Sequence, residues 1–251
     1  MVEATRWRLY LLGTKREVEK LRSVEMTVPR IEEIETELEE INKDLPRTYP
    51  SVLFFRKKMN EVRNILLWYS YTNVCVSYCQ SFSYLTYVLY HVYFHDDAFH
   101  AMVDTYYSMH KLILVVRPLL PKHKDDEGPL LYMERLENLI LNELNCYDKR
   151  LFDSVKKNQV LRHLILQGFS SFYLNWFSFK NGKRLLNFFI SKDSKVIFHR
   201  MIMFMVSFFI VNREYFIHFD ELTCMDFISR KHLFRFDSLF YQVSLLNSRS
   251  T

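Results

Sequence analysis

Residues 31–48 read IEEIETELEEINKDLPRT, and this stretch indicates the kind of fold that the chain adopts. Its apolar residues recur at every third or fourth position, at Ile31, Ile34, Leu38, Ile41 and Leu45. This spacing predicts an amphipathic helix over 31–45, and the glutamates between the apolar positions form a solvated face. Because Pro46 disfavours the helical conformation at Leu45 and cannot continue the hydrogen-bond ladder, we expect the helix to end near Asp44.

Arg47 is therefore expected on a loop. Pro46 and Pro50 flank it and fix the backbone angle φ on either side, which lowers the freedom of the loop in the unfolded chain. A stiff loop of this kind suits a side chain that is presented to a partner.

Helical patterns continue beyond this loop. We expect a helix over 53–69 that Ser51 caps and Asn73 breaks, followed by a short connection over 74–80. The next helix, over 81–90, is apolar almost all round, which is typical of a buried helix.

Later segments repeat the pattern. One helix begins at Asp96 or Asp97 and closes before Pro118, and 119–129 is the one clear loop. Further helices are predicted over 130–144, 159–177, 183–190 and 194–211, with two more within 220–246. Nothing alternates with period two for long, so the predicted fold class is all-α, a multi-helix domain.

Composition limits the possible functions. With 251 residues, 49% of them hydrophobic and 16% aromatic, residues 1–251 are expected to form a single domain. Only four glycines occur, so no glycine-rich phosphate loop is possible, and the segment 182–184 lacks the remainder of a Walker motif. The net charge of +5 is spread among interspersed acids and bases, which indicates mild attraction to acidic partners or anionic lipid, with no nucleic acid as a partner.

The expected location is cytoplasmic. No signal peptide precedes the charged start of the chain, and Cys75 and Cys79 form the only close pair among four cysteines, so we expect free thiols in a reducing compartment. The most apolar run, 201–211, has eleven residues and is too short to span a bilayer, so the chain is expected to be soluble.

Two groups of polar residues could be mistaken for sites. His91 and His95 lie four apart with His100 close by, but they sit among aromatic residues and are interpreted as structural histidines with no bound metal. The acidic run 125–127 is interpreted as a solvated turn. Since no nucleophile signature is present either, we expect no complete active site on this chain.

The string 41–48 is followed by Tyr78-Cys79-Gln80, and Gln80 lies 33 residues after Arg47. An arginine that neutralises charge on a transferring phosphoryl group and a glutamine that orients the attacking water are the two side chains that a GTP-hydrolysis site most often lacks. This chain offers both, although it has no nucleotide-binding motif of its own.

These motifs resemble those of the TBC domain family, the all-helical GTPase-activating proteins for Rab GTPases. Residues 41–48 match the family motif I-x-x-D-x-x-R-T, and residues 76–80 match its Y-x-Q motif. The resemblance extends over most of the chain, with similar segments at 7–13, 96–99, 173–177 and 185–189. It implies one domain with core motifs over about 5–215, and the helices of 216–251 belong to the same domain.

The resemblance also implies roles. Arg47 would be an arginine finger and Gln80 a glutamine finger, both inserted into the nucleotide site of a Rab-type GTPase in its GTP form, with supporting roles for Asp44, Thr48 and Tyr78. The chain would need no cofactor of its own, because GTP and Mg²⁺ arrive on the GTPase. It would act in vesicle transport, in the cytoplasm and transiently at endomembranes, with membrane association only through the partner.

Some positions depart from the family pattern. Ser77 and the segment 81–83, Ser-Phe-Ser, stand where the family has Gly, then Gly-Met-Asn, and Leu186 and Asn187 replace Trp and Asp. Two alternatives therefore stay open beside the hypothesis that the chain activates a GTPase. The same surface could bind a GTPase as an adaptor with weak or no catalysis, or the chain could be an unrelated helical scaffold.

Overall fold

Helix α6 (Ser81–Phe94) forms the centre of the N-terminal half of the computed structural model. The structure describes residues 2–24, 35–73, 76, 78–120, 128–158 and 160–249. Within these ranges every regular element is a helix, so the predicted all-α class is confirmed. The α-helices are α1 Val2–Leu11, α2 Lys15–Arg22, α3 Glu35–Asp44, α4 Leu53–Lys57, α5 Met59–Thr72, α6 Ser81–Phe94, α7 Ala101–Val116, α8 Gly128–Tyr147, α9 Lys149–Asn158, α10 Val160–Phe169, α11 Phe179–Phe189, α12 Ser194–Val211, α13 Arg213–His218, α14 Glu221–Ser229 and α15 Phe236–Arg249. Short 3₁₀ helices are η2 Leu45–Arg47, η3 Arg117–Leu119, η4 Leu174–Trp176 and η5 Lys231–Leu233.

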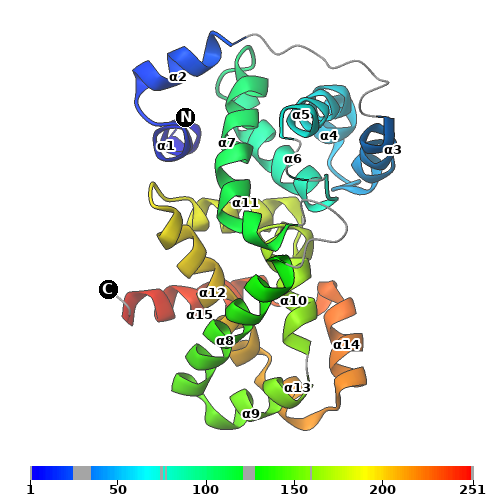
Figure 1. The fold of residues 1–251 in the computed structure, drawn as a ribbon, viewed down its shortest axis with the longest axis vertical. Coiled ribbons are helices and arrows are strands. Elements are labelled where there is room, and N and C mark those ends of the chain that lie inside the picture. The colour runs from blue at the N-terminus through cyan, green and yellow to red at the C-terminus, as the bar shows by residue number, and fades with distance from the viewer. Residues whose placement is uncertain are drawn as a thin grey trace.

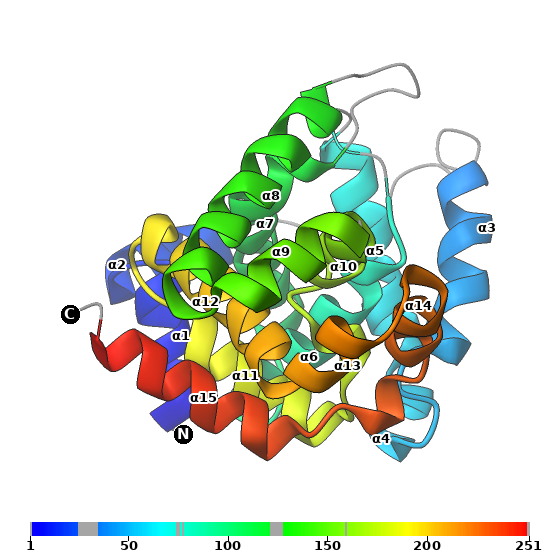
Figure 2. The ribbon, with the colours of Figure 1, turned by 90° about the horizontal axis from the view of Figure 1, so that it is seen from below.

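The helices form two halves. Figure 1 shows α1 to α7 in the upper half and α8, α9 and α12 to α15 in the lower half, with α11 between them. Both views place α1 and α2 on the opposite side of the molecule from α3 (Figure 2). Helix α6 packs against α5 and α7, and eleven of its fourteen residues are buried, as its almost uniformly apolar sequence predicts.

Helix α12 is the corresponding core helix of the lower half and packs against α15, α8 and α7. Its bounds are those predicted from the sequence. By length and composition it is the one helix in the described ranges that is apolar enough to cross a membrane, with 56% of its eighteen residues buried inside the protein. The apolar run 201–211 considered from the sequence has only eleven residues, whereas the whole apolar helix has eighteen residues. A mostly buried core helix of a soluble protein meets the same criterion of length and composition.

The prediction of one helix over 159–177 was wrong. Helix α10 ends at Phe169, and Phe172 and Tyr173 adopt left-handed φ angles of 51° and 57°. This turn buries the Tyr173 ring, whose hydroxyl donates to the Met201 carbonyl at 3.0 Å. Gly168 permits the packing, because an added Cβ would lie 2.4 Å from the ring. Burial of an aromatic side chain thus ends the helix where the periodicity would continue it.

Other predicted boundaries also differ. Lys58 interrupts the expected helix over 53–69, dividing it into α4 and α5, and Val52 occupies the N-cap position in place of Ser51. Helix α7 begins at Ala101, because Asp97 accepts a hydrogen bond from the His100 backbone and forms a turn there.

Of the other expected segments, the predicted helix over 31–45 corresponds to α3 from Glu35 onward, and residues 31–34 lie outside the described ranges. Residues 121–127 of the predicted loop lie outside them too, whereas Gly128 and Pro129 begin α8.

Candidate functional site

Arg47 ends the 3₁₀ turn η2 that follows α3. Its side chain is 64% exposed. The guanidinium nevertheless makes two hydrogen bonds to the end of the preceding helix, from Nε to the Lys43 carbonyl at 2.9 Å and from Nη2 to Asp44 Oδ1 at 2.6 Å. The arginine is thus presented at the surface and held in one direction by the end of α3.

Asp44 connects this arginine to the second motif. Its other carboxylate oxygen, Oδ2, accepts a hydrogen bond from the Tyr78 hydroxyl at 3.2 Å. Asp44 is buried, as is Tyr78. Burial, together with the negative charge of Asp44, raises the pKa of Tyr78 well above its ordinary value, so the phenol keeps its proton and acts as a donor.

Thr48 provides a second connection from within the core. Its buried hydroxyl lies 2.9 Å from the Asp44 carbonyl and 2.8 Å from Ser83 Oγ. Ser83 Oγ in turn lies 2.7 Å from the Gln80 carbonyl, which also accepts from the Ser83 amide at 3.1 Å. The two motifs are therefore joined by side chains that are fully inside the protein.

Tyr49 anchors the loop from beneath. Its backbone has a positive φ of 48°, which directs the side chain into the core while Arg47 points outward. The ring packs edge-on against Tyr84 at 5.1 Å and Phe179 at 5.6 Å between centroids, and the hydroxyl donates to the Leu174 carbonyl at 3.0 Å. Such a strained backbone angle persists only where the surrounding structure fixes it.

Gln80 precedes the first turn of α6 and has helical backbone angles. Its side chain is exposed and forms no hydrogen bond with the residues that the structure describes. Of the predicted site residues, Arg47 and Gln80 thus face solvent, whereas Asp44, Thr48 and Tyr78 are buried.

Sequence reasoning missed two residues of this site. Ser83 was noted only as part of a departure from the family pattern, although a serine in the first turn of a helix often bonds to the carbonyl three residues back. No signal in the sequence would have shown that Tyr49 has a positive φ.

Leu186 and Asn187, which depart from the family pattern, lie in α11, and Asn187 makes a polar contact with α1. Asn187 Oδ1 accepts a hydrogen bond from Trp7 Nε1 at 2.9 Å and another from Arg6 Nη2, and Leu186 is fully buried. Asn187 thus holds α1 on α11 without a negative charge. Ser81 Oγ lies 2.8 Å from Cys79 Sγ, and Ser77 lies outside the described residues.

His91 and His95 lie in an aromatic environment. Their ring centroids are 4.4 Å apart, and the His91 ring packs against Phe54 and Phe179. Burial, reinforced by His95 and Lys183, lowers the pKa of His91 to about 4, so the ring is neutral near pH 7. Among the residues that the structure describes, no group of three or more His, Cys, Asp or Glu side chains is placed to hold a metal ion.

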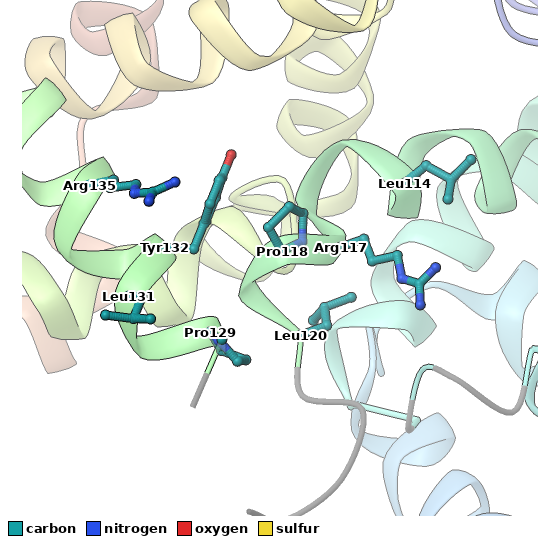
Figure 3. Close-up of a pocket in the computed structure, with 9 residues that line it drawn as sticks. Leu114, Arg117, Pro118, Leu120, Pro129, Leu131, Tyr132 and Arg135 are labelled. Carbon is teal, nitrogen blue, oxygen red and sulfur yellow. The ribbon is translucent and has the colours of Figure 1, made fainter. Parts of the chain in front are cut away.

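A cavity of about 580 Å³ lies between η3 and the start of α8 (Figure 3). Its lining combines apolar side chains with the guanidinium groups of Arg117 and Arg135. None of the five predicted site residues lines it, so the chemistry of Arg47 and Gln80 belongs to the exposed surface and not to this cavity.

Comparison with known proteins agrees with this architecture. The sequence profile of the Rab-GTPase-TBC domain family matches residues 4–216, and the chain belongs to this family. Membership of this family implies a Rab GTPase as the partner. No curated protein matches the chain in sequence.

Among solved structures, the fold is similar to the crystal structure of the Ypt/Rab-GAP domain of Gyp1p, with a TM-score of 0.74 and 12% sequence identity. The match covers 99% of this chain and 88% of that one. At this identity the similarity concerns the fold.

Proposed function

We propose that this chain accelerates GTP hydrolysis by a Rab-type GTPase and supplies Arg47 and Gln80 to the nucleotide site of that partner. The observation that carries the proposal is the linkage of the two motifs through buried hydrogen bonds. Asp44 bonds to both Arg47 and Tyr78, and Thr48 contacts Ser83, which bonds to the Gln80 carbonyl. Arg47 and Gln80, the two exposed side chains that the mechanism requires, therefore lie on segments that these hydrogen bonds connect.

Arg47 would neutralise charge on the transferring phosphoryl group. A guanidinium is always protonated and presents a planar fork of donors that matches phosphate oxygens. To reach them, Arg47 must leave Asp44, and its exposed guanidinium can then be solvated or bind phosphate, while the buried Asp44 keeps the hydrogen bond from Tyr78. An arginine supplied in trans contributes on the order of 10³ to 10⁵ in rate.

Gln80 would orient the attacking water. A side-chain amide offers an acceptor and two donors, so it can hold a water molecule in line with the phosphoryl group. Its exposed position at the start of α6 leaves the amide available to a partner. The chain needs no cofactor of its own in this mechanism, since the GTPase in its GTP form carries GTP and Mg²⁺.

The test is single-turnover phosphate release from a panel of GTP-loaded Rab proteins, with the native chain compared with Arg47→Ala and Gln80→Ala. Arg230→Ala is a matched control, because Arg230 is also an exposed arginine that directly follows a helix and pairs with an aspartate near the end of that helix, Asp226 of α14. We expect acceleration by the native chain and the control, and its loss in each finger variant.

Failure of every Rab to respond, with binding of one or more retained, would replace this proposal with the adaptor function. We further propose that the protein acts in vesicle transport, in the cytoplasm and transiently at endomembranes through its partner. A fluorescent fusion whose membrane recruitment does not depend on the responding Rab would contradict that location.

A further inference from the structure

Thr48 and Ser83 have fewer protons than the hydrogen bonds in which they could take part. Three oxygen–oxygen contacts of 2.7 to 2.9 Å run in a row, from the Asp44 carbonyl to Thr48, from Thr48 to Ser83, and from Ser83 to the Gln80 carbonyl. Each hydroxyl carries one proton, and carbonyl oxygens carry none. Two protons therefore serve three contacts.

Bulk solvent does not reach these two hydroxyls. Thr48 is 2% exposed and Ser83 is fully buried. If both hydroxyls donated outward to the carbonyls, the two oxygens would face each other at 2.8 Å with no hydrogen between them, so one hydroxyl donates to the other. Either Ser83 donates to Thr48, or Thr48 donates to Ser83.

The two arrangements differ in which motif's carbonyl receives the second hydroxyl proton. When Ser83 donates to Thr48, Thr48 donates to the Asp44 carbonyl. When Thr48 donates to Ser83, Ser83 donates to the Gln80 carbonyl. Neither carbonyl is left unpaired, because the Thr48 amide reaches Asp44 at 3.1 Å and the Ser83 amide reaches Gln80 at 3.1 Å.

Tyr78 forms the other connection between the motifs. The hydroxyl of Tyr78 donates to Asp44 Oδ2 at 3.2 Å. The same carboxylate binds Arg47 through Oδ1. Ser83 is the one side chain among the described residues that forms hydrogen bonds with both the Thr48 side chain and the Gln80 backbone.

We propose that Ser83 is a positioning residue that couples residues 45–50 around Arg47 (the Arg47 loop) to residues 78–83 at the start of α6 (the Gln80 loop), through the hydroxyl pair it forms with Thr48. Neither hydroxyl touches the nucleotide. The pair holds the two loops in one spatial relation, so that both fingers enter the partner's site together. This inference rests on the proposed function, although the coupling is a property of the unbound chain.

The first arm of the test measures catalysis. Ser83→Ala and Thr48→Val each remove one hydroxyl, and we expect each to lower the single-turnover rate constant roughly tenfold at saturating chain, the scale of one net hydrogen bond. Binding of the GTPase loaded with a non-hydrolysable GTP analogue should stay unchanged, and Thr48→Ser should keep the native rate. Ser207→Ala is the matched control, since Ser207 is a buried helical serine that donates to the Met203 carbonyl at 2.7 Å in the lower half of the protein.

Coupling between the two hydroxyls predicts a specific result for the double variant. The double variant Thr48→Val with Ser83→Ala should lose no more activity than either single variant, because both remove the same contact. Losses that multiply would overturn the proposal, as would a native rate in Thr48→Val.

The second arm needs no GTPase. Amide hydrogen exchange in the unbound chain should accelerate at Thr48 when Ser83 is replaced by Ala, and at Ser83 when Thr48 is replaced by Val. If the native chain activates no GTPase, the proposed function fails while this exchange result still decides the coupling. If each substitution changes exchange only in the loop that carries it, the proposed coupling is wrong.

Discussion

The Arg47 guanidinium donates from Nη2 to Asp44 Oδ1 at 2.6 Å, although most of the arginine side chain is exposed and the aspartate is buried. The pair is therefore asymmetric. Arg47 can turn away from Asp44 and be solvated, whereas Asp44 remains in place and keeps its bond to Tyr78. This arrangement suits an arginine that changes partner when a GTPase binds.

We predict that Arg47→Lys loses most of the acceleration that an arginine finger provides, on the order of 10³ to 10⁵ in rate, although the charge is kept. A lysine is a compact charge without the planar fork that matches phosphate oxygens. Single-turnover phosphate release measures the loss, and Arg230→Lys on the exposed pair with Asp226 is the control. Near-native activation by Arg47→Lys would show that only the positive charge matters.

Asp44→Ala should lower the free energy of unfolding by about 1–3 kcal/mol, because the Tyr78 hydroxyl would be left buried without its acceptor. Asp226→Ala removes an aspartate that is 55% exposed and paired with Arg230, so it should change stability by no more than about 0.5 kcal/mol. Urea denaturation followed by circular dichroism compares the two variants. Equal losses would mean that Asp44 is not a structural support for Tyr78.

Asn187→Asp should stabilise the protein. Arg6 and Trp7 already donate to Asn187 Oδ1, and a carboxylate at this position would accept charge-assisted bonds worth about 1 kcal/mol more. It would also offset the repulsion between Arg6 and Arg200, where burial and then Arg6 lower the pKa of Arg200.

The gain has a defined pH dependence. Arg6 would lower the folded-state pKa of the new carboxyl below its unfolded value of about 3.9, so the gain should be full above that pH and disappear as the pH falls through the folded pKa. Thermal denaturation at pH 7 and pH 3 measures this difference. A stabilisation that is equal at both pH values would argue against an ionic origin.

His91 should make stability depend on pH in a narrow window. Burial, then His95 and Lys183, lower its folded-state pKa to about 4, against about 6.5 in the unfolded chain. The unfolded state therefore binds the proton more readily, so this contribution to stability is complete above pH 6.5 and is lost as the pH falls toward 4. The full shift would correspond to about 3.4 kcal/mol, and because the His91 side chain is only partly buried we expect a change on the order of 2 kcal/mol.

His91→Phe should remove that dependence. The ring fits among Phe54 and Phe179, and because His91 Nδ1 is buried with no hydrogen-bond partner among the described residues, the substitution removes no observed bond at that atom. Denaturation curves at pH 7, 6, 5 and 4 compare it with His163→Gln, which alters an exposed histidine. A slope that persists in His91→Phe would assign the titration to another group.

Much of the fold followed from local sequence. The three-to-four spacing before Pro46 predicted α3 and its end near Asp44, and the apolar character of 194–211 predicted α12 with its observed bounds. Predictions failed where side chains overrode the periodicity. Tyr173 ended α10 by turning into the core, and Asp97 delayed the start of α7 by bonding to His100. The extent of the domain, 1–251, stays a prediction.

The sequence by itself determined that the chain is helical, that it belongs with the Rab-GTPase-TBC domains, and that Arg47 and Gln80 are the residues to test, because periodicity, proline and short motifs act over a few neighbouring positions. Only the tertiary structure decided how those two residues are supported. Thr48 and Ser83 are 35 positions apart, and Asn187 lies 180 positions from Trp7. Such contacts arise from the packing of whole helices, and no local pattern specifies them.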